Sequence, residues 1–156
     1  MPIPASVKQY LDNQGIKYDV VAHAHTANSL RSAGAAHISG DQLAKSVVVG
    51  DERGYVLAVI PATHRLDLGV LSRQMQRRLG LATEPEVGGL FEDCEFGAVP
   101  PLGPAYGIRM VVDESLTHCT DVYFEAGDHT DLVHVSGPDF LRLIETAPRG
   151  QFSHHI

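Results

Sequence analysis

Apolar residues recur along the chain with two different periods, and each period predicts a different kind of element. Leu68, Leu71, Met75 and Leu79 are spaced as on one face of an amphipathic helix. The segment Val47–Val49 is apolar and β-branched on both faces, which is typical of a strand at the centre of a sheet. The same periods predict helices over residues 5–13, 29–36, 67–79, 84–91 and 140–144, and strands over residues 18–22, 43–49, 55–60, 109–112, 122–126 and 132–135.

Glycine, proline and serine residues mark where these elements begin and end. Ser29 is placed to cap the second helix, and Gly80 to stop the third. Residues 50–54 predict a hairpin loop, whereas the prolines and glycines of residues 96–104 predict a fixed loop without regular structure. Because hairpins interrupt an irregular alternation of helices and strands, we expect an α/β or α+β domain around a mixed sheet.

Length and composition favour one globular domain over residues 1–156. The chain has 156 residues, of which 44% are hydrophobic, so it can bury a core of its own. Cys94 and Cys119 lie far apart and form neither a disulfide nor a zinc pattern. No apolar run has the length of a membrane span, and residues 1–10 lack the pattern of a secretory signal. We therefore expect a cytoplasmic protein with no membrane partner.

The net charge of the chain argues against binding of a nucleic acid over a large surface. The net charge is −7, whereas proteins that bind a duplex along its backbone usually carry a basic excess. A local basic patch could still bind a single-stranded end. The residues available for such a patch are Arg65, Arg73, Arg77 and Arg78. An ordinary solvated helix face is favoured over a binding patch as the interpretation of these arginines.

Lys45 is the first candidate for chemistry, because it lies in an otherwise apolar strand. By alternation it shares a face with Val47 and Val49. Its ammonium group could meet a phosphate or carbonyl oxygen at the edge of a pocket. On the residues alone, a strand-end lysine that reaches solvent is the favoured interpretation.

The loop that starts at Gly97 is the second candidate. The amides of Gly97, Ala98 and Val99 could polarise an ester carbonyl, since the prolines that follow have no N–H to donate. A packed surface loop is an equally good interpretation. His129 lies beside an acidic neighbour in the turn between two predicted strands, where it could act as a base or orient a substrate, or be an ordinary turn histidine.

The remaining histidines and cysteines give weaker signals. His23 and His25 could share one face and hold a metal, but no second pair has useful spacing, so a solvated loop is favoured. His154 and His155 are interpreted as a tail, and Cys94 is a nucleophile without an identifiable base. The chain has no G-x-S-x-G, P-loop, G-x-G-x-x-G or H-E-x-x-H motif.

Three segments in a particular order carry a resemblance to a known family. They are Ala44–Val49 (AKSVVV), Gly97–Gly103 (GAVPPLG) and Tyr123–His129 (YFEAGDH). Together they resemble the YbaK/prolyl-tRNA synthetase-associated domain family, over about residues 7–143. The lysine strand, the G-x-x-x-P loop and the late G-x-H turn are specific in combination, although none is specific alone.

The resemblance implies a fold, an activity and a set of site residues. Members of the family form one α/β domain with a mixed, partly barrel-like sheet and hydrolyse the ester of mischarged tRNA, free-standing or within prolyl-tRNA synthetase. It implies that Lys45 contacts the 3′-terminal nucleotide and that the loop from Gly97 to Pro101 faces the aminoacyl carbonyl. It further implies that Ser46, Gly127 and His129 bind substrate, and that neither metal nor cofactor takes part.

We therefore expect a trans-editing aminoacyl-tRNA deacylase whose partner is the 3′ end of aminoacyl-tRNA, with a synthetase as a further candidate partner. An activated ester needs a placed water and a polarised carbonyl rather than a triad, so the missing motifs do not oppose this activity. The alternative is a module of the same fold that binds a tRNA end or a synthetase without turnover. The sequence does not identify the amino acid, the general base or the oligomeric state.

Overall fold

The computed structural model describes residues 3–26, 28–95 and 97–156 of the chain. Five α-helices occur in these ranges: α1 (Ala5–Asn13), α2 (Ser29–Ala35), α3 (Leu68–Met75), α4 (Glu84–Leu90) and α5 (Gly137–Leu143). The strands are β1 (Asp19–Ala22), β2 (Leu43–Asp51), β3 (Gly54–Pro61), β4 (His64–Leu66), β5 (Gly80–Leu81), β6 (Arg109–Asp113), β7 (Asp121–Glu125), β8 (Asp131–Ser136), β9 (Arg149–Gly150) and β10 (Ser153–His155). Short 3₁₀ helices are η1 (Gly40–Gln42), η2 (Gly103–Tyr106) and η3 (Glu114–His118).

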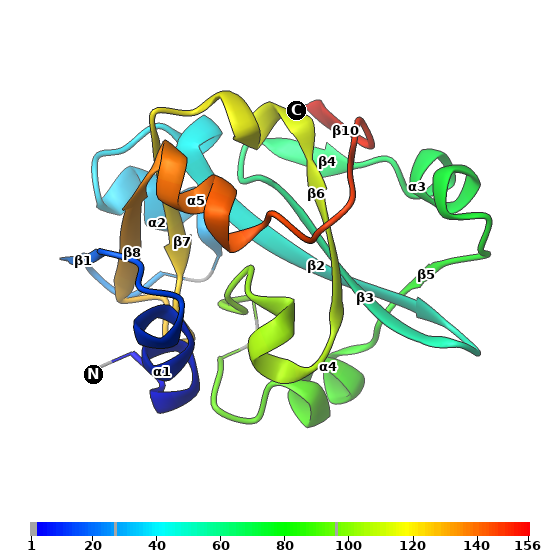
Figure 1. Ribbon diagram of the computed structural model, residues 1–156, viewed down its shortest axis with the longest axis horizontal. Coiled ribbons are helices and arrows are strands. Elements are labelled where there is room, and N and C mark those ends of the chain that lie inside the picture. Colours follow the sequence, from blue (N-terminus) through cyan, green and yellow to red (C-terminus); the bar gives the residue numbers. More distant parts are fainter. Residues whose placement is uncertain (1–2, 27, 96) are drawn as a thin grey trace.

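A mixed sheet with the order β1-β8-β7-β2-β3-β6-β9 forms the centre of the molecule, and β5 adds to β2. The long β2–β3 hairpin crosses its middle, with α5 on the near side and α2 behind (Figure 1). Strands β2 and β7 run parallel and pair only through Leu43–Ala44 and Tyr123–Phe124, after which they separate. The point at which parallel strands part at their carboxyl ends is where α/β sheets usually place a ligand site.

The two faces of the sheet bury different amounts of apolar surface. The main core lies on the face covered by α1, α4 and α5, and includes Leu11, Phe91 and Phe140. Two smaller clusters lie on the other face, one under α3 around Leu71 and one under α2 around Leu43. Because both faces are buried, the sequences of β2 and β3 contain continuous apolar runs and do not alternate between apolar and polar residues.

The expected mixed α/β architecture is confirmed, while several boundaries differ from the sequence-based expectation. The cap of α2 is Asn28, whose Oδ1 accepts a hydrogen bond from the Arg31 amide at 2.9 Å, and not Ser29. Helix α3 ends at Met75 because Gln76 adopts a left-handed conformation, so Gly80 does not terminate it. Helix α5 begins three residues before the expected start, because Ser136 caps it and Pro138 fits its first turn.

The C-terminal segment is not the expected tail. β10 pairs antiparallel with β4, and His154 Nδ1 lies 2.6 Å from Asp67 Oδ1. The loop over residues 96–104 also contains the start of η2 at Gly103, where a side chain would meet the Ile108 carbonyl oxygen at 2.4 Å. Within the described ranges, no helix has the length and apolar character that a membrane span requires.

Candidate active site

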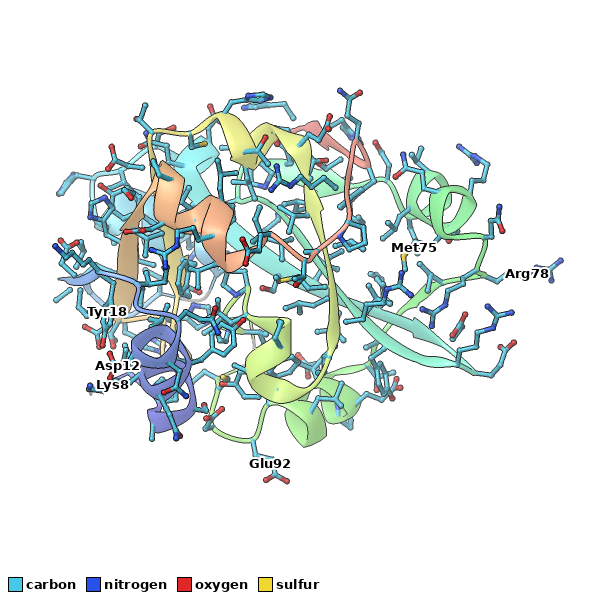
Figure 2. The ribbon with its side chains drawn as sticks, in the orientation of Figure 1. Lys8, Asp12, Tyr18, Met75, Arg78 and Glu92 are labelled. Carbon is cyan, nitrogen blue, oxygen red and sulfur yellow. The ribbon has the colours of Figure 1, made fainter. Side chains whose placement is uncertain are left out.

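A cavity of about 790 Å³ opens at the carboxyl end of β7. Its walls come from the start of α1, the segment that follows α4, and the turn between β7 and β8. The lining residues are Pro4, Ala5, Ser6, His25, Glu92, Asp93, Cys94, Glu95, Ala126, Gly127, Asp128 and Thr130. Figure 2 shows Glu92 pointing away from the body of the molecule, which places its carboxylate at the rim.

The G-x-x-x-P loop and the G-x-H turn are joined by backbone hydrogen bonds. The Glu95 amide donates to the Gly127 carbonyl oxygen at 2.7 Å, and the Gly127 amide donates to the Ala98 carbonyl oxygen at 2.9 Å. Gly127 has a φ of 104°, and a Cβ there would come within 3.0 Å of Pro4 Cγ. Glycine is therefore required at 127 both for its conformation and for the close approach of α1.

The loop amides that the sequence predicts as carbonyl donors are not equivalent. The Ala98 amide already donates to the Glu95 carbonyl oxygen at 3.0 Å. Gly97 is exposed and has a φ of 80°, whereas Val99 is buried. Pro101 is buried as well and anchors the end of the loop in the protein. The residues that line the cavity do not include 97–101, so the amides of Gly97 and Val99 stay predicted donors.

His129 belongs to a buried polar pair. Its Nδ1 lies 2.7 Å from Glu125 Oε2, and the two side chains are 3% and 2% exposed. The Ser32 hydroxyl donates to the other oxygen of Glu125, and lies 2.6 Å from the Thr26 hydroxyl. A buried carboxylate is tolerated when donors surround it in this way. The pair therefore connects α2 to the turn at the cavity.

Lys45 and Ser46 lie on opposite faces of β2. Ala44 and Val48 belong to the main core, so alternation places Ser46 on that face and Lys45 on the other. The Lys45 ammonium donates to the Ala62 carbonyl oxygen at 3.3 Å. Burial, and then the nearby charge of Arg65, lower the pKa of Lys45.

The register brings Lys45 toward Glu125. Ala44 pairs with Phe124 across the parallel strands, and one further step along each strand reaches Lys45 and Glu125 on the same face. Lys45 is half-buried there and is not one of the residues that line the cavity. Among the predicted site residues, the structure thus joins Gly127 to the loop from Gly97, and buries His129 against Glu125. Lys45 and His129 are not among the residues that line the cavity.

Sequence reasoning missed the role of His25 in forming the cavity. His25 lines the cavity, and its Nε2 lies 3.3 Å from each carboxylate oxygen of Glu95. Its ring also meets that of His129 edge-on, with centroids 6.1 Å apart. The H-x-H pattern marked His25 as a possible ligand, but no local signal could reveal a partner seventy positions away.

Cys94 lines the cavity in a form that is poorly suited to nucleophilic attack. Burial raises the pKa of the Cys94 thiol to about 12, against the opposing effect of a hydrogen bond with Tyr106. The Tyr106 hydroxyl lies 3.4 Å from Cys94 Sγ and donates to Asp93 Oδ1 at 2.9 Å. Since the thiolate is the nucleophilic form, a thiol mechanism is disfavoured.

The arginines and possible metal ligands that the sequence suggested do not form a second site in the part of the chain that the structure describes. Arg77 makes a two-pronged ion pair with Asp51, through Nε at 2.8 Å and Nη2 at 2.5 Å, so it is engaged within the protein. Arg73 and Arg78 are exposed, and Arg78 points away from the body of the molecule (Figure 2). Over residues 3–26, 28–95 and 97–156, no three His, Cys, Asp or Glu side chains are grouped as a metal site requires.

Comparison with known proteins identifies the family. The model of the aminoacyl-tRNA editing domain matches residues 21–143, so the chain belongs to this family. The match confirms the resemblance that the three sequence segments indicate. It also agrees with the mixed α/β fold and with a role in tRNA editing.

Solved structures with the same fold support this assignment. A structure described as a candidate trans-editing enzyme for prolyl-tRNA synthetase has a TM-score of 0.83 and 27% identity, covering 98% of this chain and 99% of its own. A hypothetical protein has a TM-score of 0.83 at 24% identity, covering 96% and 99%.

A candidate signal transduction protein from Marinobacter aquaeolei VT8 has a TM-score of 0.80 at 21% identity. The likeness covers 97% of this chain but 31% of that protein, so the chain spans about a third of its length. The two structures below 25% identity bear on the fold alone. No curated protein gives a significant match.

Proposed function

We propose that the protein is a trans-editing deacylase that hydrolyses the ester of mischarged tRNA without a metal. The observation that carries the proposal is the cavity of about 790 Å³ lined by Cys94, Glu95 and Gly127, in a chain of the aminoacyl-tRNA editing family. The loop from Gly97 adjoins it through the hydrogen bond from the Gly127 amide to the Ala98 carbonyl oxygen. A cavity of this size is in the range of small-molecule sites. It is large enough for an aminoacyl group together with part of a terminal nucleoside.

The charges around the cavity suit the aminoacyl end of the substrate better than the tRNA backbone. Asp93, Glu95 and Asp128 are acidic residues of the lining, and Glu92 lies at the rim. Carboxylates attract the α-ammonium group of an aminoacyl ester and repel phosphates. We therefore place the amino acid in the cavity and the phosphates outside it, near Lys45.

The proposed roles follow from the positions of the groups. Gly97 and Val99 donate their amides to the carbonyl oxygen, where negative charge develops during hydrolysis. Lys45 contacts the terminal nucleotide from the face of β2 opposite the main core. Because Lys45 is half-buried, less water screens its charge, which strengthens this contact. His129 and Glu125 hold the turn and Ser32 in place beneath the cavity. Ser46 lies on the opposite face of β2 from Lys45. We propose that it affects substrate binding indirectly, through the backbone of this strand.

The test is single-turnover deacylation with a panel of tRNAs mischarged with alanine, serine or threonine. We expect the wild-type protein to release one of these amino acids and Lys45→Ala to release it about 100-fold more slowly, as after removal of one aligned charge-stabilising donor. Lys17→Ala is the matched control, because Lys17 is an exposed lysine outside the site. Near-wild-type release by Lys45→Ala would overturn the role of the lysine.

The same experiment distinguishes the binding-module alternative. The net charge of −7 and the internal pairing of Arg77 leave little basic surface for holding a whole tRNA. If the folded protein binds a tRNA end or a synthetase but releases no amino acid from any tRNA of the panel, the binding module becomes the better description.

A further inference from the structure

We infer that His25 is the general base of this site and that Glu95 orients it. The inference rests on the proposed deacylase function and supplies a proton acceptor for its water. His25 lines the cavity, and its Nε2 is held 3.3 Å from both oxygens of Glu95. An imidazole oriented by a carboxylate beside a substrate cavity is the recurring arrangement of a base and its orienting group.

The contact with Glu95 assigns the tautomer of His25. An ionised carboxylate only accepts hydrogen bonds, so Nε2 of a neutral His25 carries the hydrogen. Nδ1 then carries the lone pair and can take a proton from water. The His25 ring also meets the ring of His129 edge-on, and His129 is held by its pair with buried Glu125. Two separate contacts therefore restrict the orientation of a side chain that is otherwise 59% exposed.

Glu95, which contacts His25, is also joined to the loop of the proposed carbonyl donors. The Glu95 carbonyl oxygen accepts the Ala98 amide in the turn that contains Gly97. The carboxylate that holds the base and the loop that holds the carbonyl thus belong to one turn. This backbone hydrogen bond keeps the loop beside the residue that holds the base, and the cavity lining itself reaches Glu95 in this segment. A short distance between base and carbonyl donors is what attack by water on a bound carbonyl requires.

The charged groups around His25 are mostly acidic. Glu95 contacts it directly, and His129, paired with Glu125, faces it from the turn after β7. Asp93 and Asp128 are two further acidic residues of the lining, whereas Glu92 points outward at the rim. The Cys94 thiol lies in the same lining and is protonated, because burial raises its pKa to about 12. A developing imidazolium is stabilised by the negative charges, which lowers the barrier to proton transfer.

The proposed step balances with water as the only co-reactant. A water proton passes to Nδ1 of His25 as the water oxygen bonds to the ester carbonyl carbon. The bond from that carbon to the ribose oxygen then breaks, and the imidazolium returns the proton to the leaving ribose oxygen. The products are the free amino acid and a tRNA with an intact terminal hydroxyl.

The experiment uses the full chain and the mischarged tRNA that the wild-type protein hydrolyses fastest. Single-turnover rates at saturating protein are measured between about pH 5 and pH 8, the range in which histidine titrates, with the uncatalysed rate subtracted. The variants are His25→Gln, His25→Ala with and without added imidazole, Glu95→Gln and Glu95→Asp. His118→Gln is the matched control, because His118 is an exposed histidine at the end of η3.

We expect His25→Gln to lower the rate about 100-fold, the lower end of what general base catalysis contributes. We also expect it to lose the rise of rate with pH that the wild type and His118→Gln retain. Imidazole should restore part of the rate of His25→Ala, and Glu95→Asp should keep more of the rate than Glu95→Gln. Circular dichroism and thermal melting confirm that each variant is folded.

Two failures can be told apart. If the wild type hydrolyses the ester and His25→Gln keeps both its rate and its pH profile, the base assignment is overturned and the deacylase function stands. A loss that appears only as weaker tRNA binding, or a variant that imidazole does not rescue, has the same consequence. If the wild type releases no amino acid from any tRNA, the proposed function fails and this inference fails with it.

Discussion

Two carboxylates, Asp113 and Glu125, are buried at the ends of β6 and β7, which β2 and β3 separate in the sheet, and they have different partners. Asp113 is 3% exposed and Glu125 2% exposed. Asp113 Oδ1 accepts hydrogen bonds from the amide and hydroxyl of Ser115, and Oδ2 accepts them from the Phe152 amide and the Ser153 hydroxyl. Glu125 instead shares its oxygens between one hydroxyl and a histidine.

The difference teaches how to separate a structural carboxylate from one that serves a site. The four donors of Asp113 are neutral and come from η3 and the C-terminal segment, so the carboxylate ties β10 to the sheet. The partner of Glu125 is titratable and lies at the cavity, in the turn that contains Gly127. Saturation by neutral donors favours stability, whereas a buried pair with a titratable group beside a cavity favours function.

Glycine substitutions provide the largest expected contrast between the two regions. Gly97 and Gly107 are both exposed with positive φ values of 80° and 69°, but Gly97 is in the loop at the cavity and Gly107 precedes the strand that ends at Asp113. A side chain in this conformation costs about 1–2 kcal/mol at either position. We expect Gly97→Val to lower deacylation about 100-fold, because it displaces an amide donor, and Gly107→Val to lower only the melting temperature. Equal activity of the two variants would break the comparison.

Changing each buried carboxylate to its amide tests the comparison directly. Asp113→Asn turns an amide group toward backbone and hydroxyl donors, and we expect it to cost about 1–3 kcal/mol of unfolding free energy with unchanged turnover per folded molecule. Glu125→Gln weakens the hold on His129, and we expect deacylation to fall about tenfold, at the low end for positioning effects. Urea unfolding and single-turnover rates measure the two effects. A larger loss of turnover in Asp113→Asn than in Glu125→Gln would reverse the assignment.

Combining Glu125→Gln with His129→Ala sharpens this result. The two side chains form one buried pair in direct contact, so their effects on the rate should be strongly non-additive. We expect the double variant to react at most about threefold more slowly than the slower of the two single variants, because the second substitution removes a contact that is already lost. Full additivity would mean that the two residues act independently.

Much of the fold could be predicted from the sequence because its elements have local causes. The 3.6-residue period of α1 and the apolar run of β2 carry their own signals, and the loop at residues 50–54 connects the predicted hairpin. The exact end of α3 could not be predicted, because it depends on a left-handed Gln76 rather than on a glycine. The pairing of β4 with β10 joins segments almost ninety positions apart and has no local signal.

The candidate site shows the same division. Gly127 and His129 could be predicted as site residues because they stand in one short motif, and Gly127 lines the cavity. The partner of His25 was not found, because Glu95 approaches it only after α1, α4 and β7 have packed together. In the same way, Ser32 marks only a polar position on α2 until the fold brings Glu125 against it.

The ion pair between Asp51 and Arg77 tests acid stability away from the cavity. The hydrogen bonds from Arg77 lower the pKa of Asp51 from 3.8 to about 2. Because the folded-state pKa is below the unfolded value, the pair stabilises the protein fully above about pH 4 and loses this effect as the pH falls toward 2. We expect Arg77→Gln to flatten this part of the pH dependence of unfolding, with little change in deacylation. A matched loss of activity at neutral pH would instead connect this pair to the site.

Cys94 should give the smallest effect, although it lies in the cavity wall. Burial raises its pKa to about 12, so the thiol remains protonated at neutral pH and supplies neither charge nor nucleophile. Serine keeps a donor of similar size toward Asp93 and Tyr106, so we expect Cys94→Ser to retain deacylation within about twofold, as substitutions outside the chemical step usually do. Single-turnover rates and resistance of the wild-type protein to a thiol-alkylating reagent measure this. An inactive Cys94→Ser that remains folded would show that proximity to the cavity outweighs protonation state, and would restore the thiol as a nucleophile.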